Sequence, residues 1–354
     1  MAKSTICILF GGRSAEHEVS ISSARSIYNN LNPEKFEIIT LYIDKSGRWR
    51  TVDSPHLSIE ELNAGPFRSF LPWFNEPSVN AVKADVYFPI LHGPYGEDGT
   101  IQGFFEICDV PYVGAGVMAS AIGMDKAIAK AVFQQKNLPV VKHTVLCETE
   151  WMNEPEACLD TVRKEYAPPI FVKPANLGSS VGITKVGDFS RLASAIKEAF
   201  LFDRKILVEE GIQGRELECS VLGNEDPRAS LPGEIIPFND FYDYKDKYID
   251  GKTSYGIPAE LPSNVIKEVQ RISIEAFKSI EGTGMARVDF FLQDQTQKVY
   301  LNEINTIPGF TEISMYPKLW EVSGLSYSRL LEELVSLALE KFGQKKSGEK
   351  KFSP

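Results

Sequence analysis

Residues 285–311 read MARVDFFLQDQTQKVYLNEINTIPGFT, and this stretch indicates both a strand pairing and a site. Two short runs, 287–292 and 299–304, are rich in β-branched and aromatic residues and are separated by a polar turn, which predicts a β-hairpin. Because side chains alternate along a strand, one face of the first strand should carry Arg287, Asp289 and Phe291. By the same alternation, one face of the second strand should carry Val299, Leu301, Glu303 and Asn305.

If the register of the hairpin brings these faces together, Asp289, Glu303 and Asn305 form one cluster of oxygen ligands beside the guanidinium of Arg287. Such a cluster suits a magnesium ion that also holds phosphate oxygens. The alternative is a sheet edge whose acids are simply solvated. We favour the metal site, because these acids lie between large apolar residues, where an unpaired carboxylate costs several kcal/mol.

Length and composition limit what the whole chain can be. At 354 residues it exceeds one compact core and should divide into two or three domains. Hydrophobic residues make up 43% and charged residues 24%, which is typical of a soluble globular protein. The net charge of −10 disfavours nucleic acid or an anionic membrane as the main partner.

Two further features indicate a cytoplasmic protein. No apolar run is long enough to span a bilayer, and residues 1–12 lead directly into a strand and a glycine turn instead of a signal peptide. The five cysteines are scattered with no C-x-x-C pair, which argues against a disulfide framework or a zinc site. We therefore expect a reducing, cytoplasmic environment and no membrane association.

The first third of the chain predicts an α/β domain. Strands are expected over 5–10, 37–43 and 85–91, and a helix over 15–31 follows the turn Gly11-Gly12.

Two candidate site residues lie where open α/β sheets bind ligands, beyond the carboxyl ends of strands. Glu16 falls in the first turn of the expected helix, and His92 opens the loop HGPYGEDGT, residues 92–100. Each has a structural alternative, since the helix dipole favours acids in a first turn and His92 can be a satisfied core imidazole.

A second unit begins near residue 122 and carries a stronger signal. The pattern between residues 116 and 137 is helical, with Lys126 in its middle. Lys173 lies in an expected strand, 170–174, that leads into the Gly/Ser turn ANLGSSVG and a further strand, ITKV. Backbone N–H groups of such a turn can bind a triphosphate beside the lysine ammonium. The spacing is neither a Walker loop nor a dinucleotide fingerprint, so a polar hairpin with an ordinary lysine stays an alternative.

Residues 206–210, after a helix expected over 188–200, form a strand that contains Glu209 and Glu210. A strand edge of this kind can give main-chain hydrogen bonds to a purine, with a glutamate such as Glu216 on ribose hydroxyls.

The last unit should contain strands over 216–222 and 231–236, then helices over 263–280 and 326–342. The aromatic loop from Phe238 to Gly251 contains FYDYKDKY. Long loops without their own secondary structure are often functional lids, and we expect a lid here.

Together these motifs closely resemble the D-alanine–D-alanine ligases of the ATP-grasp superfamily. The resemblance covers almost the whole chain, and its motifs are GGRSAEHEVS, HGPYGEDGT, MDK, VKPANLGSSVGI, EEGIQGRE, FYDYKDKY, ARVDF and NEINTIPGFTEISMYP. It implies an α/β N-terminal domain over 1–121 and two α+β domains, over 122–215 and 216–354, that clamp ATP, with a lid loop over 238–258. It also implies an enzyme that joins two D-alanines with ATP for peptidoglycan precursor synthesis, expected to be a homodimer.

The resemblance implies a role for each candidate residue. The residues expected to bind ATP are Lys126, Lys173, Ser179, Ser180, Glu209, Glu210, Ile212, Glu216 and Lys247. Two magnesium or manganese ions would be held by Asp289, Glu303 and Asn305. D-Alanine would contact Glu16, His92, Ser314 and Met315. The catalytic residues would be Glu16, Ser179, Tyr248, Arg287 and Gly309.

The implied chemistry suits these residue types. A carboxylate attacks the γ-phosphoryl group while magnesium, lysine and arginine neutralise the charge, and a closed lid protects the acyl phosphate from water. The tetrahedral oxyanion of the second step needs fixed donors such as Arg287.

Small departures from the family pattern are Gly211, where relatives often carry a larger residue, and Ile307 before Pro-Gly. Formation of D-alanyl-D-lactate is the nearest alternative. The lid sequence argues against it, because Tyr248 agrees with the dipeptide-forming members, whereas relatives that make D-alanyl-D-lactate usually differ in this loop. Another ATP-grasp carboxylate–amine ligase and a nucleotide-binding protein without catalysis are the remaining hypotheses.

Overall fold

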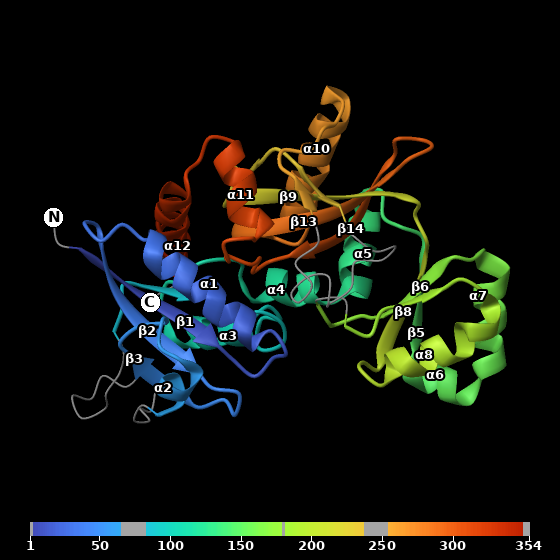
Figure 1. Cartoon of the computed structure of the whole chain (residues 1–354), viewed down its shortest axis with the longest axis horizontal. Coiled ribbons are helices and arrows are strands. Elements are labelled where there is room, and N and C mark those ends of the chain that lie inside the picture. Colours follow the sequence, from blue (N-terminus) through green and yellow to red (C-terminus); the bar gives the residue numbers. More distant parts are fainter. Residues whose placement is uncertain (1–2, 65–82, 179–180, 237–253, 350–354) are drawn as a thin grey trace.

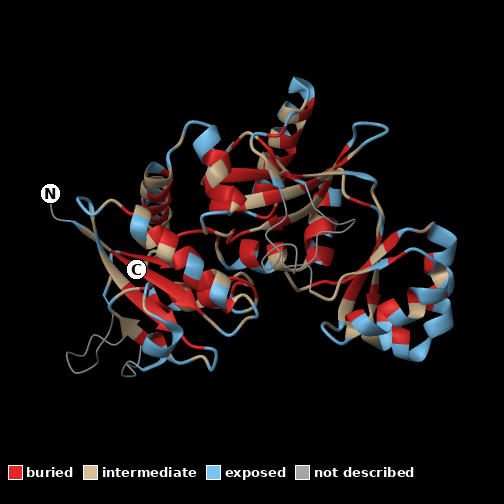
Figure 2. Ribbon diagram, in the orientation of Figure 1, coloured by how far each residue is buried: buried red, intermediate tan, exposed pale blue. Residues whose placement is uncertain are grey.

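The structure is a computed structural model and describes residues 3–64, 83–178, 181–236 and 254–349. These residues form three β-sheets with helices packed against them (Figure 1), which confirms the α/β class expected from the sequence. Buried residues follow the inner faces of the sheets, and exposed residues follow the outer faces of the helices (Figure 2).

The N-terminal sheet has the strand order β3-β2-β1-β4. Its strands are β1 (Ser4–Gly11), β2 (Phe36–Ile43), β3 (Trp49–Val52) and β4 (Val86–Pro89). Its helices are α1 (His17–Asn30), α2 (Ile59–Ala64) and α3 (Thr100–Cys108). Because β1 runs parallel to β4, the carboxyl ends of both strands lie at one edge of the sheet, where α1 begins. Glu16 and His92 follow these two strand ends and are therefore brought together.

The central sheet is antiparallel and has the order β5-β8-β6-β7. Its strands are β5 (His143–Cys147), β6 (Ile170–Pro174), β7 (Thr184–Val186) and β8 (Lys205–Glu210). Its helices are α6 (Glu148–Asn153), α7 (Pro155–Glu165) and α8 (Leu192–Phe200), the last preceded by a short 3-10 helix (Phe189–Arg191).

The third sheet has the order β12-β11-β9-β13-β14, with β10 paired to β9. Its strands are β9 (Gly214–Gly223), β10 (Arg228–Ala229), β11 (Gly233–Ile236), β12 (Ser254–Gly256), β13 (Gly284–Gln293) and β14 (Val299–Asn305). Helix α10 (Ser263–Ser279) packs against it and shares its core. Most of the predicted lid, 238–258, lies outside the described residues, and its last part includes β12, which pairs with β11.

The prediction of one helical stretch between residues 116 and 137 is wrong in one respect, because the structure contains two helices there. Helix α4 (Val117–Met124) ends and α5 (Lys126–Gln135) begins at Asp125, whose backbone is extended with φ −88 and ψ 98. The Asp125 carboxylate accepts hydrogen bonds from the N–H groups of Ala127 and Ile128, both at 3.1 Å. Aspartate is among the strongest N-cap residues, and this cap places Lys126 at the first position of a new helix.

The hairpin expected from residues 285–311 forms as β13 and β14, but the predicted face of the second strand is wrong. Asp289 pairs with Glu303, whereas the next residue, Phe290, pairs with Leu301, so a β-bulge interrupts the ladder at this point. The extra residue reverses the alternation, and Leu301 is buried in the core while Glu303 is half-buried on the opposite face.

Of the two C-terminal helices, α11 (Met315–Val322) packs on β9, and α12 (Tyr327–Glu349) returns to α1 and β4 of the N-terminal domain (Figure 1). The buried residues of α12 are Leu330, Leu331, Leu334, Val335 and Ala338, as the sequence predicted. They belong to the same hydrophobic core as Ile6, Ile8 and Phe10 of β1. The first and last parts of the chain therefore share one core, and the domain boundaries at residues 122 and 216 stay predictions.

The helices of the described residues include none that is both long and apolar enough to cross a membrane.

Candidate active site

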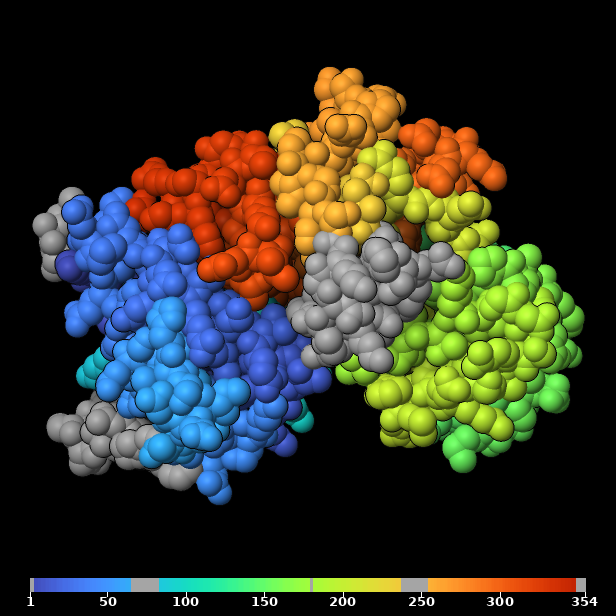
Figure 3. Space-filling view, viewed as in Figure 1, coloured from blue at the N-terminus to red at the C-terminus, as the bar shows by residue number. Residues whose placement is uncertain are grey.

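Two neighbouring cavities contain most of the candidate residues. The first, of about 930 Å³, lies between α1, the loop after β4, and the hairpin β13–β14, and we call it the N-terminal cavity. The second, of about 680 Å³, lies between the central sheet and the third sheet, and we call it the central cavity. They share the lining residues Gly178, Glu218, Ile235 and Glu303, so a ligand in one can meet a ligand in the other at this wall. On the molecular surface the central sheet and its helices form a separate green lobe (Figure 3).

Arg287 lies at the wall between the cavities and is held by two carboxylates. Its Nε and Nη2 atoms donate to the two oxygens of Asp289, each at 2.7 Å, and Nε lies 3.2 Å from Glu218 Oε2. Burial alone would lower the pKa of Arg287, but the charges of Asp289 and Glu218 raise it well above its usual value. The guanidinium is therefore a fixed cation in the N-terminal cavity, which it lines.

The three predicted metal ligands lie beside Arg287 on adjacent strands. The register pairs Asp289 with Glu303 and Arg287 with Asn305. Asp289 lines the central cavity, Asn305 lines the N-terminal cavity and Glu303 lines both. The donor set of two carboxylates and one amide oxygen fits a hard divalent cation.

Within the described part of the chain, no group of three or more His, Cys, Asp or Glu side chains is arranged to hold a metal ion. Both oxygens of Asp289 accept hydrogen bonds from Arg287, and Glu303 lies 3.3 Å from the ammonium of Lys126. The magnesium assignment therefore stays a prediction that fits the donor chemistry.

The two predicted phosphate-binding lysines face the same cavity from different elements. Lys126 begins α5, and its ammonium donates to the carbonyl oxygen of Leu177 at 2.6 Å, at the base of the predicted phosphate turn. Lys173 lies in β6, and its Nζ is 3.3 Å from Asn302 Oδ1 of β14. Both lysines line the central cavity.

Glu209 of β8 also lines the central cavity and is bound by two lysines. Its Oε2 lies 2.8 Å from Lys173 Nζ, and its Oε1 lies 3.1 Å from Lys130 Nζ. Burial alone would raise the pKa of Glu209, but the charges of Lys130 and Lys173 lower it below its usual value. Glu209 is therefore a buried but ionised carboxylate at the edge of the central cavity.

Lys130 is a residue that the sequence reasoning missed. It lies four residues after Lys126 on α5, so both side chains leave the same face of that helix. That spacing was the only available signal, because an interior lysine of a helix is ordinarily solvated.

The far end of the central cavity is lined by the residues expected at the base and ribose, which are Glu210, Ile212 and Glu216. Between the first two, the N–H of Gly211 donates to the carbonyl oxygen of Pro169 at 3.0 Å. A Cβ atom at Gly211 would lie 2.4 Å from that oxygen, so the backbone packs too closely here for a larger residue. This contact is the physical reason for glycine in this chain.

The N-terminal cavity is lined by Glu16 at the start of α1. Its carboxylate lies near two glycines from different parts of the chain. A Cβ atom added to Gly93 would lie 2.9 Å from Glu16 Oε2, and one added to Gly178 would lie 3.5 Å from the same oxygen. The carboxylate therefore faces the end of the phosphate turn, at the wall between the cavities.

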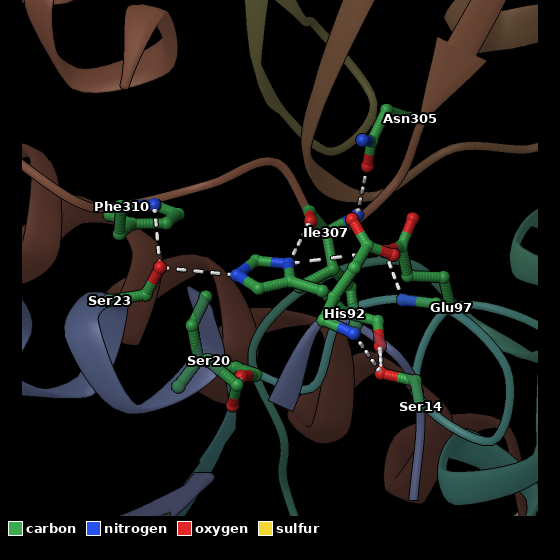
Figure 4. Close-up of polar contacts among 12 residues, drawn as sticks. Ser14, Ser20, Ser23, His92, Glu97, Asn305, Ile307 and Phe310 are labelled. Carbon is green, nitrogen blue, oxygen red and sulfur yellow. Dashed lines mark hydrogen bonds and ion pairs between the residues drawn. The ribbon is translucent and has the colours of Figure 1, made fainter. Parts of the chain in front are cut away.

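His92 lines this cavity, but both its ring nitrogens have protein partners (Figure 4). Nδ1 lies 3.1 Å from the carbonyl oxygen of Ile307, and Nε2 lies 3.1 Å from Ser23 Oγ, which also accepts from the N–H of Phe310 at 3.2 Å. Burial lowers the pKa of His92, so the ring is neutral and donates from Nδ1 to the carbonyl. Contact between His92 and a substrate stays a prediction. The hydrogen bonds of its ring to Ser23 and Ile307 join the first and last parts of the chain.

Glu97 is a second residue that the sequence reasoning did not select. Its Oε1 accepts from the N–H of Gly93 at 2.7 Å and lies 3.9 Å from His92 Nδ1 (Figure 4). Burial and the nearby charge of Glu16 raise the pKa of Glu97 to about 8, so this carboxyl holds a proton at neutral pH.

Gly309, Ser314 and Met315 lie together at the opposite wall of the N-terminal cavity. Ser314 is the N-cap of α11, and its Oγ would be only 2.6 Å from a Cβ on Gly309. Glycine is therefore needed at position 309 for the turn to lie against the start of α11. The first N–H groups of a helix attract an anion, which is the chemistry expected for a substrate carboxylate.

Four predicted site residues, Ser179, Ser180, Lys247 and Tyr248, lie outside the described residues.

Comparison with known protein families gives matches along most of the chain. Models described as D-ala D-ala ligase N-terminus and D-ala D-ala ligase C-terminus match residues 5–115 and 132–336. The D-alanine–D-alanine ligase of Thermoanaerobacter sp. strain X514 is 49% identical over 360 residues, covering 98% of this chain and 99% of the relative. That of Acetivibrio thermocellus is 44% identical over 367 residues, covering 96% and 97%.

Solved structures agree with these matches. The D-alanine–D-alanine ligase from Coxiella burnetii has a TM-score of 0.88 and 39% identity, covering 99% of this chain and 98% of that one. The VanG D-Ala:D-Ser ligase from Enterococcus faecalis has a TM-score of 0.83 and 34% identity, covering 95% and 100%. The two structures share this architecture although their names give different second substrates.

Proposed function

Because the chain belongs to the D-alanine–D-alanine ligase family, we propose that it joins two D-alanine molecules into D-alanyl-D-alanine, with conversion of ATP to ADP and phosphate. This product serves peptidoglycan precursor synthesis. The observation that supports the proposal best is the pair of cavities with a shared wall. One contains lysines suited to a triphosphate, and the other contains a carboxylate suited to an ammonium group.

We place ATP in the central cavity. Lys126 and Lys173 would bind its phosphates, Glu209, Glu210 and Ile212 would contact adenine, and Glu216 would bind the ribose. Lys247, Ser179 and Ser180 complete this set by family resemblance. The magnesium or manganese ions, held by Asp289, Glu303 and Asn305, would supply charge neutralisation at the phosphate oxygens.

We place both D-alanines in the N-terminal cavity. The Glu16 carboxylate would accept hydrogen bonds from the ammonium of the first D-alanine, within a network that includes Ser179 and Tyr248. Ser314 and the N–H of Met315 would bind the carboxylate of the second, with His92 beside it. This arrangement directs the carboxylate of the first D-alanine toward the shared wall and the phosphates beyond it.

The reaction has two steps. First, a carboxylate oxygen of one D-alanine bonds to the γ-phosphorus of ATP. The bond between the γ-phosphorus and the β–γ bridging oxygen breaks at the same time, which gives D-alanyl phosphate and ADP. Then the amino nitrogen of the second D-alanine bonds to the carbonyl carbon and loses a proton, and phosphate leaves. The Arg287 guanidinium and the Gly309 N–H would stabilise the oxyanion of the tetrahedral intermediate, where one such donor contributes about 3 kcal/mol.

The architecture alone does not distinguish the second substrate, since a D-Ala:D-Ser ligase shares the fold. We propose D-alanine, because the FYDYKDKY segment with Tyr248 resembles the dipeptide-forming members. We further propose a homodimer in the cytoplasm, and mass measurement by light scattering over a range of protein concentrations tests the dimer.

The test is phosphate release from ATP with magnesium in the presence of D-alanine, L-alanine, or D-alanine with D-serine or D-lactate, with products identified by mass. We expect phosphate and D-alanyl-D-alanine with D-alanine and no product with L-alanine. Phosphate with a mixed product as the main species would change the acceptor assignment. A folded protein that binds ATP but releases no phosphate with D-alanine would refute the proposed reaction.

A further inference from the structure

Lys130 is a fully buried lysine behind the central cavity, and the proposed reaction gives it no role. Its exposed fraction is 0%, and it is absent from the described lining of the cavity. Its ammonium therefore cannot touch a nucleotide, yet it lies 3.1 Å from Glu209, which can.

The position of Lys130 depends on three elements that meet behind the cavity. Helix α5 contacts both β8 of the central sheet and β14 of the third sheet. At the start of α5, the N–H of Lys126 donates to the carbonyl oxygen of Ala175, just after β6, at 3.0 Å. The segment after α5 is joined to β14, because the N–H of Leu301 donates to the carbonyl oxygen of Pro139 at 2.7 Å. The backbone that carries Lys130 is thus fixed relative to Glu209.

The carboxylate of Glu209 is fixed by two cations that approach from different elements. Lys130 on α5 lies at Oε1, and Lys173 on β6 lies at Oε2. With both oxygens engaged, the carboxylate cannot rotate without breaking an ion pair. Oε1 is closed off from solvent, whereas Oε2 keeps a lone pair for a ligand, because a carboxylate oxygen accepts up to two hydrogen bonds.

We propose that Lys130 is a positioning residue for nucleotide recognition, which holds the Glu209 carboxylate so that it accepts a hydrogen bond from adenine and keeps Lys173 directed at the phosphates. The inference rests on the proposed function, since it takes ATP as the occupant of the central cavity. It also predicts selectivity for the base. The carboxylate only accepts hydrogen bonds, and adenine presents an amino donor where guanine presents a carbonyl acceptor.

Charge supports the same conclusion. Without Lys130, the buried pair Lys173–Glu209 would be neutral, and the site would present less positive charge to the phosphates. Burial lowers the pKa of Lys130 to about 8 while Glu209 opposes that shift, so at neutral pH the ammonium is mostly charged.

The test compares Lys130→Met, which removes the charge but keeps most of the stem, with Lys130→Arg, which keeps the charge. Lys341→Met is the matched control, because Lys341 on α12 is a half-buried lysine whose pKa burial likewise lowers to about 8. Lys341 Nζ lies 4.1 Å from the ring centre of Tyr112 and 3.3 Å from the carbonyl oxygen of Gly114, and none of these three residues lines the central cavity. Each variant is assayed for KM of ATP, KM of D-alanine, the kcat/KM ratio of ATP to GTP, and thermal midpoint.

For Lys130→Met we expect the KM of ATP to rise about tenfold or more, the effect of one hydrogen bond to a charged group, with the KM of D-alanine within about twofold. The preference for ATP over GTP should fall, and Lys130→Arg should restore most of both effects. Lys341→Met should change neither.

An unchanged KM for ATP, an unchanged ATP/GTP ratio, or equal rises in the KM of both substrates would overturn the inference. If Lys130→Met does not fold, Lys130→Gln replaces it with the same criteria. Failure of the proposed function is read separately, on the unmodified protein, as absence of D-alanine-dependent phosphate release.

Discussion

The two cavities bury ionisable groups by opposite means. In the central cavity, Glu209 lies between Lys130 and Lys173 and stays charged, since its pKa is lowered despite burial. In the N-terminal cavity, Glu97 lies near another carboxylate, Glu16, and its pKa is raised to about 8. The same burial therefore preserves a charge where the neighbours are opposite in sign and removes it where they are alike.

This difference matches the proposed ligands. A triphosphate brings negative charge, and the central cavity is lined by Lys126 and Lys173, whose ammonium groups suit phosphate oxygens. A D-alanine brings an ammonium group, and the N-terminal cavity offers the carboxylate of Glu16, beside which Glu97 is neutral. Arg287 and Glu303 lie at the wall between the cavities, where the proposed reaction takes place. Variants at the wall and in each cavity should separate these contributions.

The largest effect is expected at the wall. Arg287→Ala should lower kcat by about 10²–10³-fold, because it removes a donor to the oxyanion, while ADP affinity changes little. Steady-state kinetics and calorimetry with ADP measure the two quantities. Arg228→Ala, which removes a more exposed arginine of the same sheet, is the control. Equal losses in turnover and in ADP affinity would show that Arg287 does not act on the chemical step.

The metal prediction at the wall comes next. Glu303→Gln should raise the magnesium concentration for half-maximal activity by about 10–100-fold, since a ligand charge is lost, and a chelator should abolish activity of the unmodified protein. Titration of activity with magnesium at saturating ATP gives the comparison, and Glu340→Gln on α12 is the control. If the magnesium titration curves of Glu303→Gln and the unmodified protein coincide, Glu303 is not a metal ligand.

An effect confined to the N-terminal cavity is expected from Glu16→Gln. The KM of D-alanine should rise about tenfold, because a hydrogen bond to an ammonium loses its charge, while the KM of ATP is unaffected. The control is Glu18→Gln, two residues along, whose carboxylate is already paired with Lys45 at 2.6 Å. If the KM of ATP rose instead, the assignment of the two cavities would be reversed.

The smallest effect concerns stability and pH. With a folded pKa of about 8 and an unfolded value near 4.5, Glu97 binds a proton in the folded state that the unfolded chain releases. Its contribution therefore destabilises the protein progressively as pH rises from about 4.5 to 8. The glutamine side chain of Glu97→Gln does not titrate. Between pH 5 and 9 the thermal midpoint of this variant should therefore fall by a few degrees less than that of the unmodified protein.

Glu106→Gln gives the contrasting control for this pH series. Burial would raise the pKa of Glu106, but its hydrogen bond from Lys345 lowers it below the usual value. The stability that Glu106 contributes is present above its unfolded pKa and is lost on acidification. Glu106→Gln should therefore change the pH dependence of stability on the acidic side, and Glu97→Gln should change it on the alkaline side. Parallel curves for Glu97→Gln and the unmodified protein would mean that Glu97 is not protonated in the fold.

The sequence determined the strand pairing and much of the residue chemistry. Alternating apolar residues in β13 and β14 predict a hairpin, and that hairpin pairs Asp289 with Glu303 beside Arg287. The apolar stripe on α12 likewise predicts its buried face. These features are local in the chain, so period and residue type were enough to identify them.

Only the tertiary structure decided how distant residues meet. The bulge after Asp289 changes which residues of β14 face the core, and the Asp125 cap turns one expected helix into two. Lys130 and Glu97 become notable only because other segments bury them and set the sign of the neighbouring charge. A pKa and an ion pair depend on what surrounds a side chain in space, and that surrounding comes from residues far away in the sequence.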